Sequence, residues 1–416
     1  MKHLVLVVGI YYPQPSPTGK CAKDYVSLLK DKYNVDVIYI QSGLEKIYGR
    51  NVGNETLYGL SNWRLWLETW FLERSKKTAN KFLNNILLLG VLIMKVIGRL
   101  QSMVLFPNNL RWFYKEAYKT LCRIHKENPI DVVFTVNSPF SAHLAGDLFK
   151  KKYPNVKWVT YTVDPFYVSH KIGRVWNWNR NKAFLAEACF LKSADTNFLS
   201  EEVYENSKEL YEEIGYKTFS LPYLMPTIER WSDNKIFDSS KINLVYAGRF
   251  YKDIRNPEFL LKTILLTQNK DIVLHLYSAS DCEDVINEYV EKSAGKIIRH
   301  PLVTHQEIQK VLLSADILVS VGNSVPEFKP SKIFEYIVTG RPIINFYQNG
   351  LIDNVLARHP LVLQVDMQKS LLANSEFEEF CYAVKGRIIP QSNLESIYEK
   401  YSEQSIKKIL SLRLGM

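Results

Sequence analysis

The sequence predicts an α/β protein built from two doubly wound domains, and three observations lead to this prediction. Short runs rich in Val and Ile alternate with helical stretches along the chain, which is the pattern of parallel sheets with crossover helices. The length of 416 residues exceeds one ordinary core and suits two or three domains. A polar segment rich in turn residues, 226–241, separates two series of strands.

The two series of strands define the domain boundaries that we expect. The expected strands of the first domain, 1–226, are 4–8, 35–40, 131–135, 158–162 and 196–199. Those of the second domain, 240–390, are 242–246, 272–277, 296–299, 317–321, 342–346 and 361–364. A helical pattern within 391–416 follows with no further strand, so we expect this helix to cross back and pack on the first domain. Two such domains with a linker place a ligand in the cleft between them.

Composition excludes several classes of protein. Apolar content of 46% and charged content of 23% rule out long disorder, collagen-like repeats and a multi-span membrane protein. The five cysteines are scattered and form no CxxC pair, which excludes a disulfide framework and a thiolate zinc site and suits a reducing cytosol. The first apolar run is short and lacks a cleavage site, so we interpret it as a buried strand of a cytoplasmic protein and not as a signal peptide.

Positive charge and tryptophan concentrate in a helical region, 57–120. Residues 61–120 carry a net charge of +7 out of +10 for the chain, and four of its eight Trp. Trp63, Trp66 and Trp70 recur on one side of a predicted helix, and the basic residues Lys76 and Lys77 follow them in the chain. The apolar run 86–94 is too short to span a bilayer. Aromatic anchors beside basic residues favour contact with an anionic membrane surface.

This basic, aromatic region allows two other interpretations. The same aromatic face would also suit ordinary packing on the rest of the domain, and the sequence leaves that alternative open. Nucleic acid is not expected as a partner, because no recognisable binding motif accompanies the charge.

The most specific motif is PEFKPSKIFEY, residues 326–336. Glu327 precedes the predicted helix, Pro330 can open it, and Glu335 lies just over one turn inside it. The helix start, with Ser331 and Lys332, favours an anion, and a carboxylate one turn along can accept hydrogen bonds from ribose or sugar hydroxyls. The alternative is a simple ion pair of Lys332 with Glu335.

A second motif, YAGRFYKDIRNP, follows the strand predicted at 242–246. Arg249 and Arg255 lie six residues apart around a turn. Two guanidinium groups can hold a diphosphate in bidentate geometry without a metal ion. The alternative is that Arg249 only caps carbonyl groups of a neighbouring element.

Two loops of the first domain are weaker candidates. Gly19 precedes a helix that we expect to begin near Lys20, so backbone amides there could approach a phosphate or a sugar. Asp164 directly follows the strand 158–162, where it could bind sugar hydroxyls or transfer a proton. It could equally form a turn with Pro165. No Asp-x-Asp, GxGxxG or Gly-x-Ser-x-Gly motif occurs at the corresponding places, which disfavours a metal-dependent, nicotinamide-dependent or serine-hydrolase site.

Through these motifs the chain resembles the retaining glycosyltransferases of GT-B architecture, family-four type, particularly those that build bacterial capsular or exopolysaccharides. The resemblance implies two Rossmann-like domains that face a central cleft, with acceptor bound by the first and nucleotide sugar by the second. It also implies that Glu327 faces the donor sugar, Glu335 the ribose, and Arg249 with Arg255 the diphosphate. Gly19 would belong to a loop that closes on the donor, and Leu302 and Val303 would lie against the nucleobase.

These inferences combine into a functional hypothesis. We expect a metal-independent, retaining glycosyltransferase without a cofactor, which moves a sugar from a nucleotide-diphosphate sugar to a lipid-linked or oligosaccharide acceptor. Glu327, Arg249 and Asp164 are the expected catalytic residues, although many relatives have a His in the region of Asp164, which leaves the acceptor side open. The enzyme is expected at the inner face of the plasma membrane. The alternatives are a sugar-nucleotide epimerase and a non-catalytic membrane adaptor of the same fold.

Overall fold

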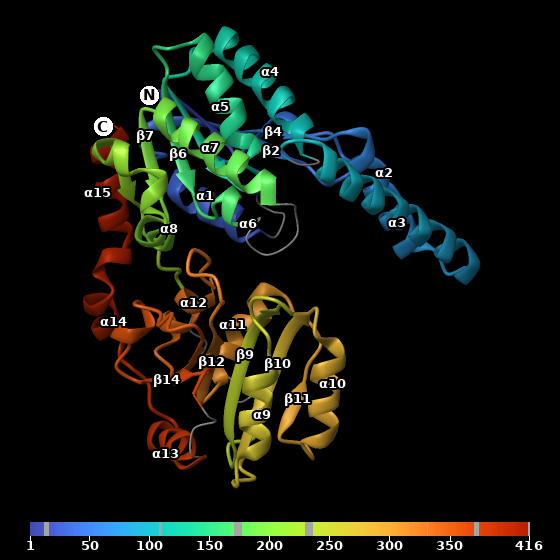
Figure 1. The fold of residues 1–416 in the computed structure, drawn as a ribbon, viewed down its shortest axis with the longest axis vertical. Coiled ribbons are helices and arrows are strands. Elements are labelled where there is room, and N and C mark those ends of the chain that lie inside the picture. Colours follow the sequence, from blue (N-terminus) through green and yellow to red (C-terminus); the bar gives the residue numbers. More distant parts are fainter. Residues whose placement is uncertain are drawn as a thin grey trace. The chain divides into compact units, whose positions relative to one another are not determined.

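Two separate β-sheets organise the chain in the computed structural model, which describes residues 1–11, 16–107, 110–169, 177–228, 236–330, 332–369 and 374–414. The first unit comprises Met1–Leu224 together with Glu403–Met416, and the second comprises Met225–Ser402. Every strand predicted from the sequence is present, with ends that differ by a few residues. Figure 1 shows the elements in sequence colours.

The first sheet has eight strands in the order β3-β4-β2-β1-β5-β6-β7-β8. All its pairs are parallel except β3 with β4. Its strands are β1 (Lys2–Val7), β2 (Tyr33–Ile40), β3 (Tyr48–Val52), β4 (Glu55–Leu60), β5 (Val132–Asn137), β6 (Lys157–Thr162), β7 (Thr196–Leu199) and β8 (Thr218–Ser220). The sequence did not predict β3, β4 or β8. The residues of β3 are all exposed, so this strand lacks the apolar run by which buried strands are found.

Helices complete the first unit. They are α1 (Pro17–Ser27), α2 (Trp63–Lys77), α3 (Lys81–Val104), α4 (Arg111–Glu127), α5 (Ser141–Lys152), α6 (Phe166–Ser169), α7 (Asn177–Ser193), α8 (Glu201–Asn206) and α15 (Glu403–Leu414), with 3₁₀ turns at Lys208–Leu210 and Glu212–Lys217. Helices α2 and α3 form a hairpin that projects from the sheet (Figure 1).

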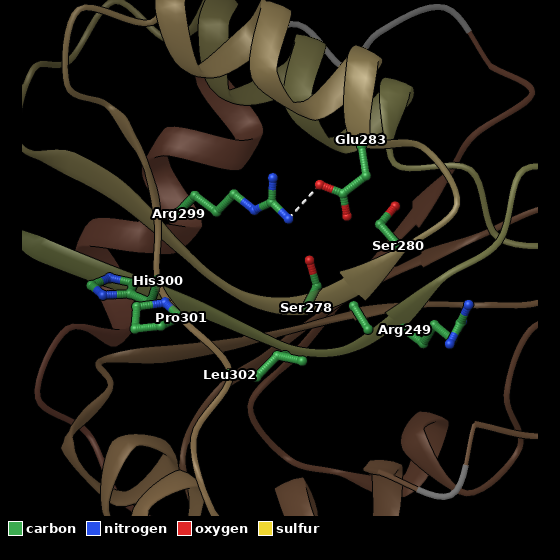
Figure 2. A pocket seen from close by; sticks show the side chains of 9 residues that line it. Arg249, Ser278, Ser280, Glu283, Arg299, His300, Pro301 and Leu302 are labelled. Carbon is green, nitrogen blue, oxygen red and sulfur yellow. Dashed lines mark ion pairs between the residues drawn. The ribbon is translucent and has the colours of Figure 1, made fainter. Parts of the chain in front are cut away.

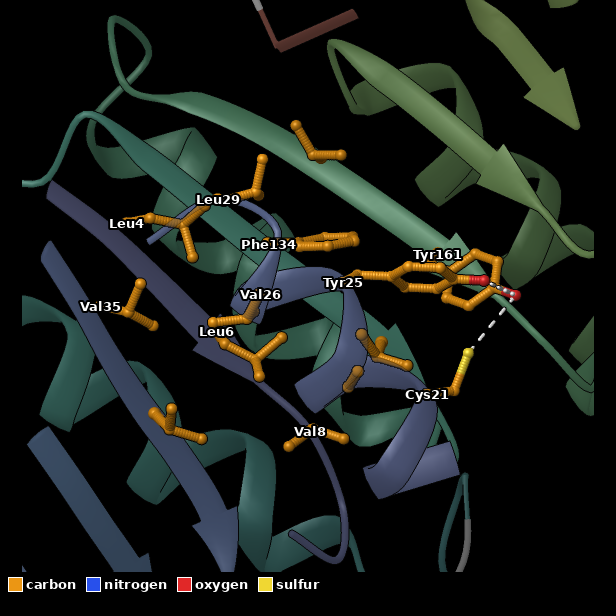
Figure 3. Packing of buried hydrophobic residues seen from close by; sticks show 14 of the residues in the cluster. Leu4, Leu6, Val8, Cys21, Tyr25, Val26, Leu29, Val35, Phe134 and Tyr161 are labelled. Atoms are coloured by element: carbon orange, nitrogen blue, oxygen red, sulfur yellow. Dashed lines mark hydrogen bonds between the residues drawn. The ribbon is translucent and has the colours of Figure 1, made fainter. Parts of the chain in front are cut away.

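Alternate residues of the central strands point to opposite faces of the first sheet. Phe134 belongs to the core on the face covered by α1 and α15. Its neighbour Thr135 faces α5, because a Cβ at Gly146 would lie 2.8 Å from the Thr135 methyl group. On the α1 face, Tyr25 and Tyr161 pack edge to face with ring centroids 5.3 Å apart (Figure 3). Their hydroxyl oxygens lie 3.2 Å apart, so these buried polar atoms are paired.

The second sheet is parallel throughout, in the order β11-β10-β9-β12-β13-β14. Its strands are β9 (Ile242–Phe250), β10 (Ile272–Ser280), β11 (Ile297–Arg299), β12 (Ile317–Val321), β13 (Ile343–Tyr347) and β14 (Val362–Asp366). The helices are α9 (Glu258–Leu266), α10 (Glu283–Lys292), α11 (His305–Ser314), α12 (Lys332–Thr339), α13 (Asn374–Val384) and α14 (Gln391–Ile397), with 3₁₀ turns at Leu356–Arg358 and Glu399–Tyr401. Strand order reverses between β9 and β12, which is where ligands bind in sheets of this kind.

The C-terminal segment is not the single helix that the periodicity predicts. It is broken into α14, a 3₁₀ turn and α15, because Ser402 adopts extended backbone angles of φ −72° and ψ 154°. The part before Ser402 belongs to the second unit, where the Tyr398 hydroxyl donates to the Val355 carbonyl at 3.1 Å. Only α15 returns to the first unit, where Ile406 and Leu410 are fully buried in the core.

Helix α1 begins earlier than the sequence predicts, at Pro17 and not near Lys20. Ser16 caps it, because its hydroxyl oxygen accepts a hydrogen bond from the Gly19 amide at 3.2 Å. A Cβ placed on Gly19 would lie 2.1 Å from the Ile10 carbonyl oxygen. Only glycine therefore allows the first turn of α1 to pack directly on the backbone that follows β1.

Gly19→Ala should destabilise the first unit, even though alanine is the better helix former. The gain in helix propensity is about 1 kcal/mol, whereas moving the Ile10 carbonyl away costs more, so we expect a net loss of about 1–2 kcal/mol. The midpoint of urea unfolding measures this change. Gly43→Ala is the control, because its Cβ would meet nothing closer than 3.7 Å. Equal midpoints for the two variants would contradict the packing role.

Candidate functional site

The carboxyl edge of the second sheet gathers both motifs of the second half of the chain. Because β9, β10, β11 and β12 run parallel, the loops that follow them meet at one edge. Arg249 lies at the end of β9, Arg255 lies in the loop that follows β9, and the loop after β12 carries Glu327. The loop after β11 carries Leu302 and Val303. The order of the strands therefore brings the two motifs and the loop after β11 to the same edge of the sheet.

A cavity of about 520 Å³ opens at this edge. It is lined by Arg249, Ser278, Ala279, Ser280, Glu283, Arg299, His300, Pro301 and Leu302 (Figure 2). Arg249 and Leu302 were predicted site residues, and both line it. Val303 does not line it but lies beside it in the chain and is exposed. The volume lies within the range of small-molecule sites.

Polar groups that the sequence analysis missed line the same cavity. Arg299 and Glu283 form an ion pair of 2.5 Å at its wall. The Ser278 side chain is 3% exposed, and its hydroxyl has no hydrogen-bond partner among the described residues. Figure 2 shows this hydroxyl directed toward the Arg299–Glu283 pair. A buried hydroxyl without a partner costs free energy, so Ser278 is a candidate contact for a ligand. Its position at the end of β10 was the available signal.

Arg249 is paired with a carboxylate on the neighbouring loop. One of its terminal nitrogens lies 2.6 Å from Asp281 Oδ1, and this hydrogen bond raises the pKa of the guanidinium. Both side chains are about half exposed, and exposed ion pairs contribute only about 0–1 kcal/mol. A phosphate group can therefore replace Asp281 at small cost.

Arg255 joins the two motif loops. Its Nε donates to Asn323 Oδ1 at 2.9 Å, and one terminal nitrogen donates to the Arg249 carbonyl at 3.2 Å. The Ser324 amide donates to the Ile254 carbonyl at 2.9 Å. Arg255 is therefore held against the backbone of Arg249 and by the loop that leads to Glu327, while the joint diphosphate role of the two guanidinium groups stays a prediction.

The Glu327 carboxylate is buried. The residue is 2% exposed, within a loop that Asn323 closes by donating from Nδ2 to the Phe328 carbonyl at 2.9 Å. A side chain so little exposed presents no open edge to a ligand in this structure. The role of Glu327 toward the donor sugar stays a prediction.

Helix α12 begins at Lys332, two residues after the Pro330 that was expected to open it, and its first turn holds an ion pair. Pro330 precedes the helix, Ser331 lies outside the described residues, and Lys332 is its first residue. The Lys332 ammonium lies 2.6 Å from Glu335 Oε2, while the His305 ring nitrogen lies 3.9 Å from Glu335 Oε1. The ion pair weighed as an alternative is thus present, and the ribose role of Glu335 stays a prediction.

In the first unit, the two weaker candidates have different surroundings. The Gly19 amide is already bound by Ser16, so this group is not open to a phosphate without displacing the cap. Asp164 lies just after β6 and is only slightly exposed, and its backbone carbonyl accepts a hydrogen bond from Asn137 at 3.1 Å. Burial, with a contribution from Glu202, raises the pKa of the Asp164 carboxyl to about 6. A carboxyl group with this pKa can exchange a proton near neutral pH.

A buried acid that the sequence analysis missed holds the Asp164 loop. Glu187 on α7 is 1% exposed and accepts hydrogen bonds from the Phe166 amide at 3.1 Å, the Tyr167 amide at 3.2 Å and Asn137 Nδ2 at 3.2 Å. Burial raises its pKa to about 7. The available signal was an acid inside the otherwise apolar helical run 183–190.

The residues predicted to touch a membrane lie along α2. Trp63 and Trp66 are 60% and 43% exposed, and Lys76 and Lys77 are exposed in the last turn. Trp70 is partly buried, with the Arg74 guanidinium 4.5 Å from its ring centroid. The Trp side chains therefore do not form one uniformly exposed face.

The longer apolar surface belongs to α3, which the sequence analysis judged too short. This helix of 24 residues is long and apolar enough to cross a membrane by length and composition. Only Leu87, Val91, Met94 and Gly98 are buried, and these face α2. Exposed apolar residues cover the other sides: Phe82, Leu83, Ile86, Leu88, Leu89, Leu92, Ile93, Val96, Leu100, Met103 and Val104.

Metal ligands are not grouped in the part of the chain that the structure describes, since no three His, Cys, Asp or Glu side chains come together there.

The two parallel-dominated α/β units and the returning C-terminal helix define the GT-B fold, the architecture predicted from the sequence. No protein-family profile and no curated protein matches the chain in sequence. Among solved structures, it is similar to sucrose-phosphate synthase from Thermosynechococcus elongatus, with TM-score 0.69 and 13% identity over 99% of this chain and 98% of that one. It is also similar to trehalose-6-phosphate synthase OtsA, with TM-score 0.63 and 11% identity over 100% and 99% of the two chains. A third is HepE from Anabaena in complex with UDP and glucose, with TM-score 0.62 and 9% identity over 99% of both.

Asp164→Asn should stabilise the protein at pH 8 and leave it unchanged at pH 4. The raised pKa means that the folded state disfavours the ionised carboxyl, so the wild type loses stability as the pH rises from about 4 to about 6. Removing the charge should therefore raise the free energy of unfolding by about 1–2 kcal/mol at pH values above about 6. Thermal unfolding at a series of pH values measures this change.

Asp31→Asn is the matched control with the opposite sign. Lys407 lies 2.9 Å from Asp31 and lowers its pKa, so its charge favours the folded state above the ordinary carboxyl pKa. This variant should be slightly less stable at pH 8. If Asp164→Asn were no more stable than the wild type at pH 8, the charge at Asp164 would carry no folding cost.

Proposed function

We propose that this protein is a glycosyltransferase that binds a nucleotide-diphosphate sugar at the carboxyl edge of its second sheet. The observation that carries the proposal is Arg249 at the wall of a cavity, with Arg255 bonded to the Arg249 carbonyl and to Asn323 on the loop that leads to the Glu327–Glu335 motif. The similar HepE structure contains UDP and glucose, and the similar E. coli trehalose-6-phosphate protein is bound to UDP-2-fluoro glucose, so this fold accommodates such donors.

The two arginines would bind the diphosphate of the donor. Arg249 would exchange Asp281 for a phosphate oxygen, while Arg255 is already fixed by Asn323 and keeps its remaining N–H donors for the same ligand. Positive charge held in place before the reaction stabilises the diphosphate as the bond to the sugar breaks. Lys332 at the start of α12 adds a further cation, and Glu335 would accept hydrogen bonds from the ribose.

In the reaction, the acceptor hydroxyl would bond to the anomeric carbon as the bond to the diphosphate oxygen breaks. The hydroxyl proton would be lost, and the nucleoside diphosphate would carry away the bonding electrons. Asp164 in the first unit is the proposed group for contact with the acceptor, since a carboxyl with a pKa of about 6 can accept this proton at neutral pH. We also propose that the anomeric configuration is retained and that no metal ion is required, on the basis of the resemblance to the retaining GT-B glycosyltransferases.

An epimerase and a non-catalytic adaptor are the competing functions. An epimerase would convert a nucleotide sugar to its epimer without an acceptor, and an adaptor would bind the nucleotide sugar without releasing nucleoside diphosphate. Incubating the protein with a panel of UDP-, GDP-, ADP-, CDP- and dTDP-sugars, with and without an oligosaccharide acceptor, separates the three. Nucleoside diphosphate release that depends on the acceptor supports the transferase.

The helical hairpin α2–α3 supports the second part of the proposal, which is that the enzyme acts at a membrane surface. The helices pack antiparallel, because Arg64 donates to the Met94 carbonyl at 3.3 Å and Ser75 donates to Asn84 Oδ1 at 2.6 Å. Between these contacts, a Cβ on Gly90 would lie 2.9 Å from the Phe71 ring. α2 therefore covers only one side of α3 and leaves its other sides exposed.

Topology argues against α3 as a membrane span. Strand β4 before the hairpin and strand β5 after it belong to the same eight-stranded sheet. A single span would put the two ends of α3 on opposite sides of a bilayer and would separate these strands. The hairpin is therefore proposed to lie in the interface, with the apolar sides of α3 toward the acyl chains.

The charge of the hairpin points to an anionic surface. Helix α3 has no Asp or Glu, and its Lys81, Lys95 and Arg99 join Lys76 and Lys77 of α2. Each such residue near anionic lipid contributes about 1 kcal/mol. We propose that the protein is peripheral on the cytoplasmic face of the plasma membrane and takes a lipid-linked saccharide acceptor for a capsular or other surface polysaccharide.

Arg249→Ala should weaken binding of a nucleoside diphosphate by about 10- to 100-fold, because it removes a charge-assisted hydrogen bond. Binding of the corresponding nucleoside should change little, since it has no phosphate. Calorimetry with UDP, GDP, ADP, CDP and dTDP provides the measurement. Arg387→Ala, on an exposed turn of the same unit, is the control. Wild-type affinity in Arg249→Ala would contradict the diphosphate role.

Replacing Leu89, Leu92 and Val96 together by Ser should release the protein from vesicles that contain anionic phosphatidylglycerol. All three side chains are exposed, so the fold should be kept, as circular dichroism will check. Vesicle flotation measures binding, and the wild type should bind neutral vesicles more weakly. Trp63→Ser with Trp66→Ser is the matched comparison and should have the smaller effect. Unchanged flotation of the α3 variant would rule out the proposed interfacial role of this helix.

A further inference from the structure

A pair of histidines connects the cavity to the interior of the second unit. His300 follows β11 and lines the cavity, and His275 lies on β10 and is buried. His300 Nε2 and His275 Nδ1 are 2.9 Å apart. The Tyr277 ring stacks on His300 with centroids 4.4 Å apart and an interplanar angle of 2°. His300 is thus held along one edge and on one face.

The contact of His275 with Asn243 determines which nitrogen of the His275 ring carries the proton. Its Nε2 lies 3.2 Å from Asn243 Oδ1. The orientation of the Asn243 amide is set independently, because its Nδ2 donates to the Asp238 carbonyl at 2.9 Å and to Asp316 Oδ2 at 3.1 Å. Both of these partners are acceptors, so nitrogen must face them and oxygen must face His275.

The tautomers of both histidines follow from this arrangement. An amide oxygen only accepts, so His275 must carry its proton on Nε2 and has a lone pair on Nδ1. His300 Nε2 must then carry the proton that it donates to His275. This leaves a lone pair on Nδ1 of His300, which no described residue engages by a hydrogen bond. Burial lowers the pKa of His275 to about 4 and also lowers that of His300, which keeps both rings neutral at pH 7.

We propose that His300 Nδ1 is a fixed hydrogen-bond acceptor that reads the nucleobase of the donor, and that His275, Asn243 and Asp316 are positioning residues that hold it in this tautomer. The inference rests on the proposed function, since it takes the cavity as the site of the base.

His300 Nδ1, as a hydrogen-bond acceptor, distinguishes bases whose central ring nitrogen carries a proton from bases in which that nitrogen has a lone pair. Uracil and thymine carry a proton on N3, and guanine carries one on N1, so each can donate to His300 Nδ1. Cytosine N3 and adenine N1 bear lone pairs there, which would face the lone pair of His300. The protein should therefore bind UDP, dTDP or GDP in preference to CDP and ADP, and bases whose ring N–H is methylated should bind poorly.

Histidine side-chain ¹⁵N NMR of the free protein tests the tautomers without any ligand. We expect a protonated Nε2 and an unprotonated Nδ1 at both His275 and His300. A protonated Nδ1 at His300 in the free protein at pH 7 would overturn the inference, whatever the enzyme does.

Calorimetry then tests the reading of the base. Wild-type protein should bind UDP or GDP about tenfold more tightly than CDP. N3-methyl-UDP should bind about as weakly as CDP. His300→Phe keeps a ring to stack on Tyr277 but has no acceptor, so it should lose this preference while still binding the diphosphate. A preference that survives in His300→Phe overturns the inference.

The positioning role is tested by two substitutions at one site. His275→Gln offers an amide oxygen to His300 Nε2 and should retain most of the preference, whereas His275→Leu offers none and should lose it. Equal preferences in the two variants would show that His275 acts only through packing. Failure of the wild type to bind any nucleoside diphosphate would instead refute the proposed function, so the two failures are distinguishable.

Discussion

The hydrogen bonds between the loops after β9 and β12 are the constraint on which the candidate site depends. The strand order places these loops side by side, and Arg255 with Ile254 joins them through Asn323 and Ser324. Arginine side chains lose considerable conformational entropy when they bind a ligand. Because Arg255 is already fixed by Asn323 and by the Arg249 carbonyl, part of that entropy has been lost before a ligand arrives.

Around this anchor, three cations of the second unit are paired with carboxylates. Arg249 pairs with Asp281, Arg299 with Glu283, and Lys332 with Glu335. Such pairs contribute little to stability where they are exposed. A diphosphate can take over the cationic partner and leave the carboxylate to sugar hydroxyls. A site of exchangeable ion pairs therefore suits an anionic substrate that must leave again after the reaction.

The first unit differs in its chemistry. Its interior contains Glu187, which binds the backbone of the Asp164 loop, and its α2–α3 hairpin exposes apolar side chains of α3. An exposed apolar surface as extensive as that of α3 is costly in water, and it indicates an interaction with something apolar. The two units therefore differ in the way that the proposed division of labour requires, in which the second unit binds a charged nucleotide and the first approaches a lipid-linked substrate.

The spacing of apolar residues and the local chemistry of the motifs were enough to predict much of the fold of this protein. The runs of Val and Ile predicted the buried parallel strands, and the polar motifs that accompany them placed Arg249 and Arg255 at one edge of one sheet, where the family resemblance also placed Leu302. Only the tertiary structure decided which helix faces find partners. The periodicity of α3 does not reveal that α2 covers one side alone, and the pattern of 394–412 does not reveal the break at Ser402. Glu187 and the His275–His300 pair are held by hydrogen bonds between residues 20 to 50 positions apart in sequence, and a local pattern does not show which distant residues will be bonded.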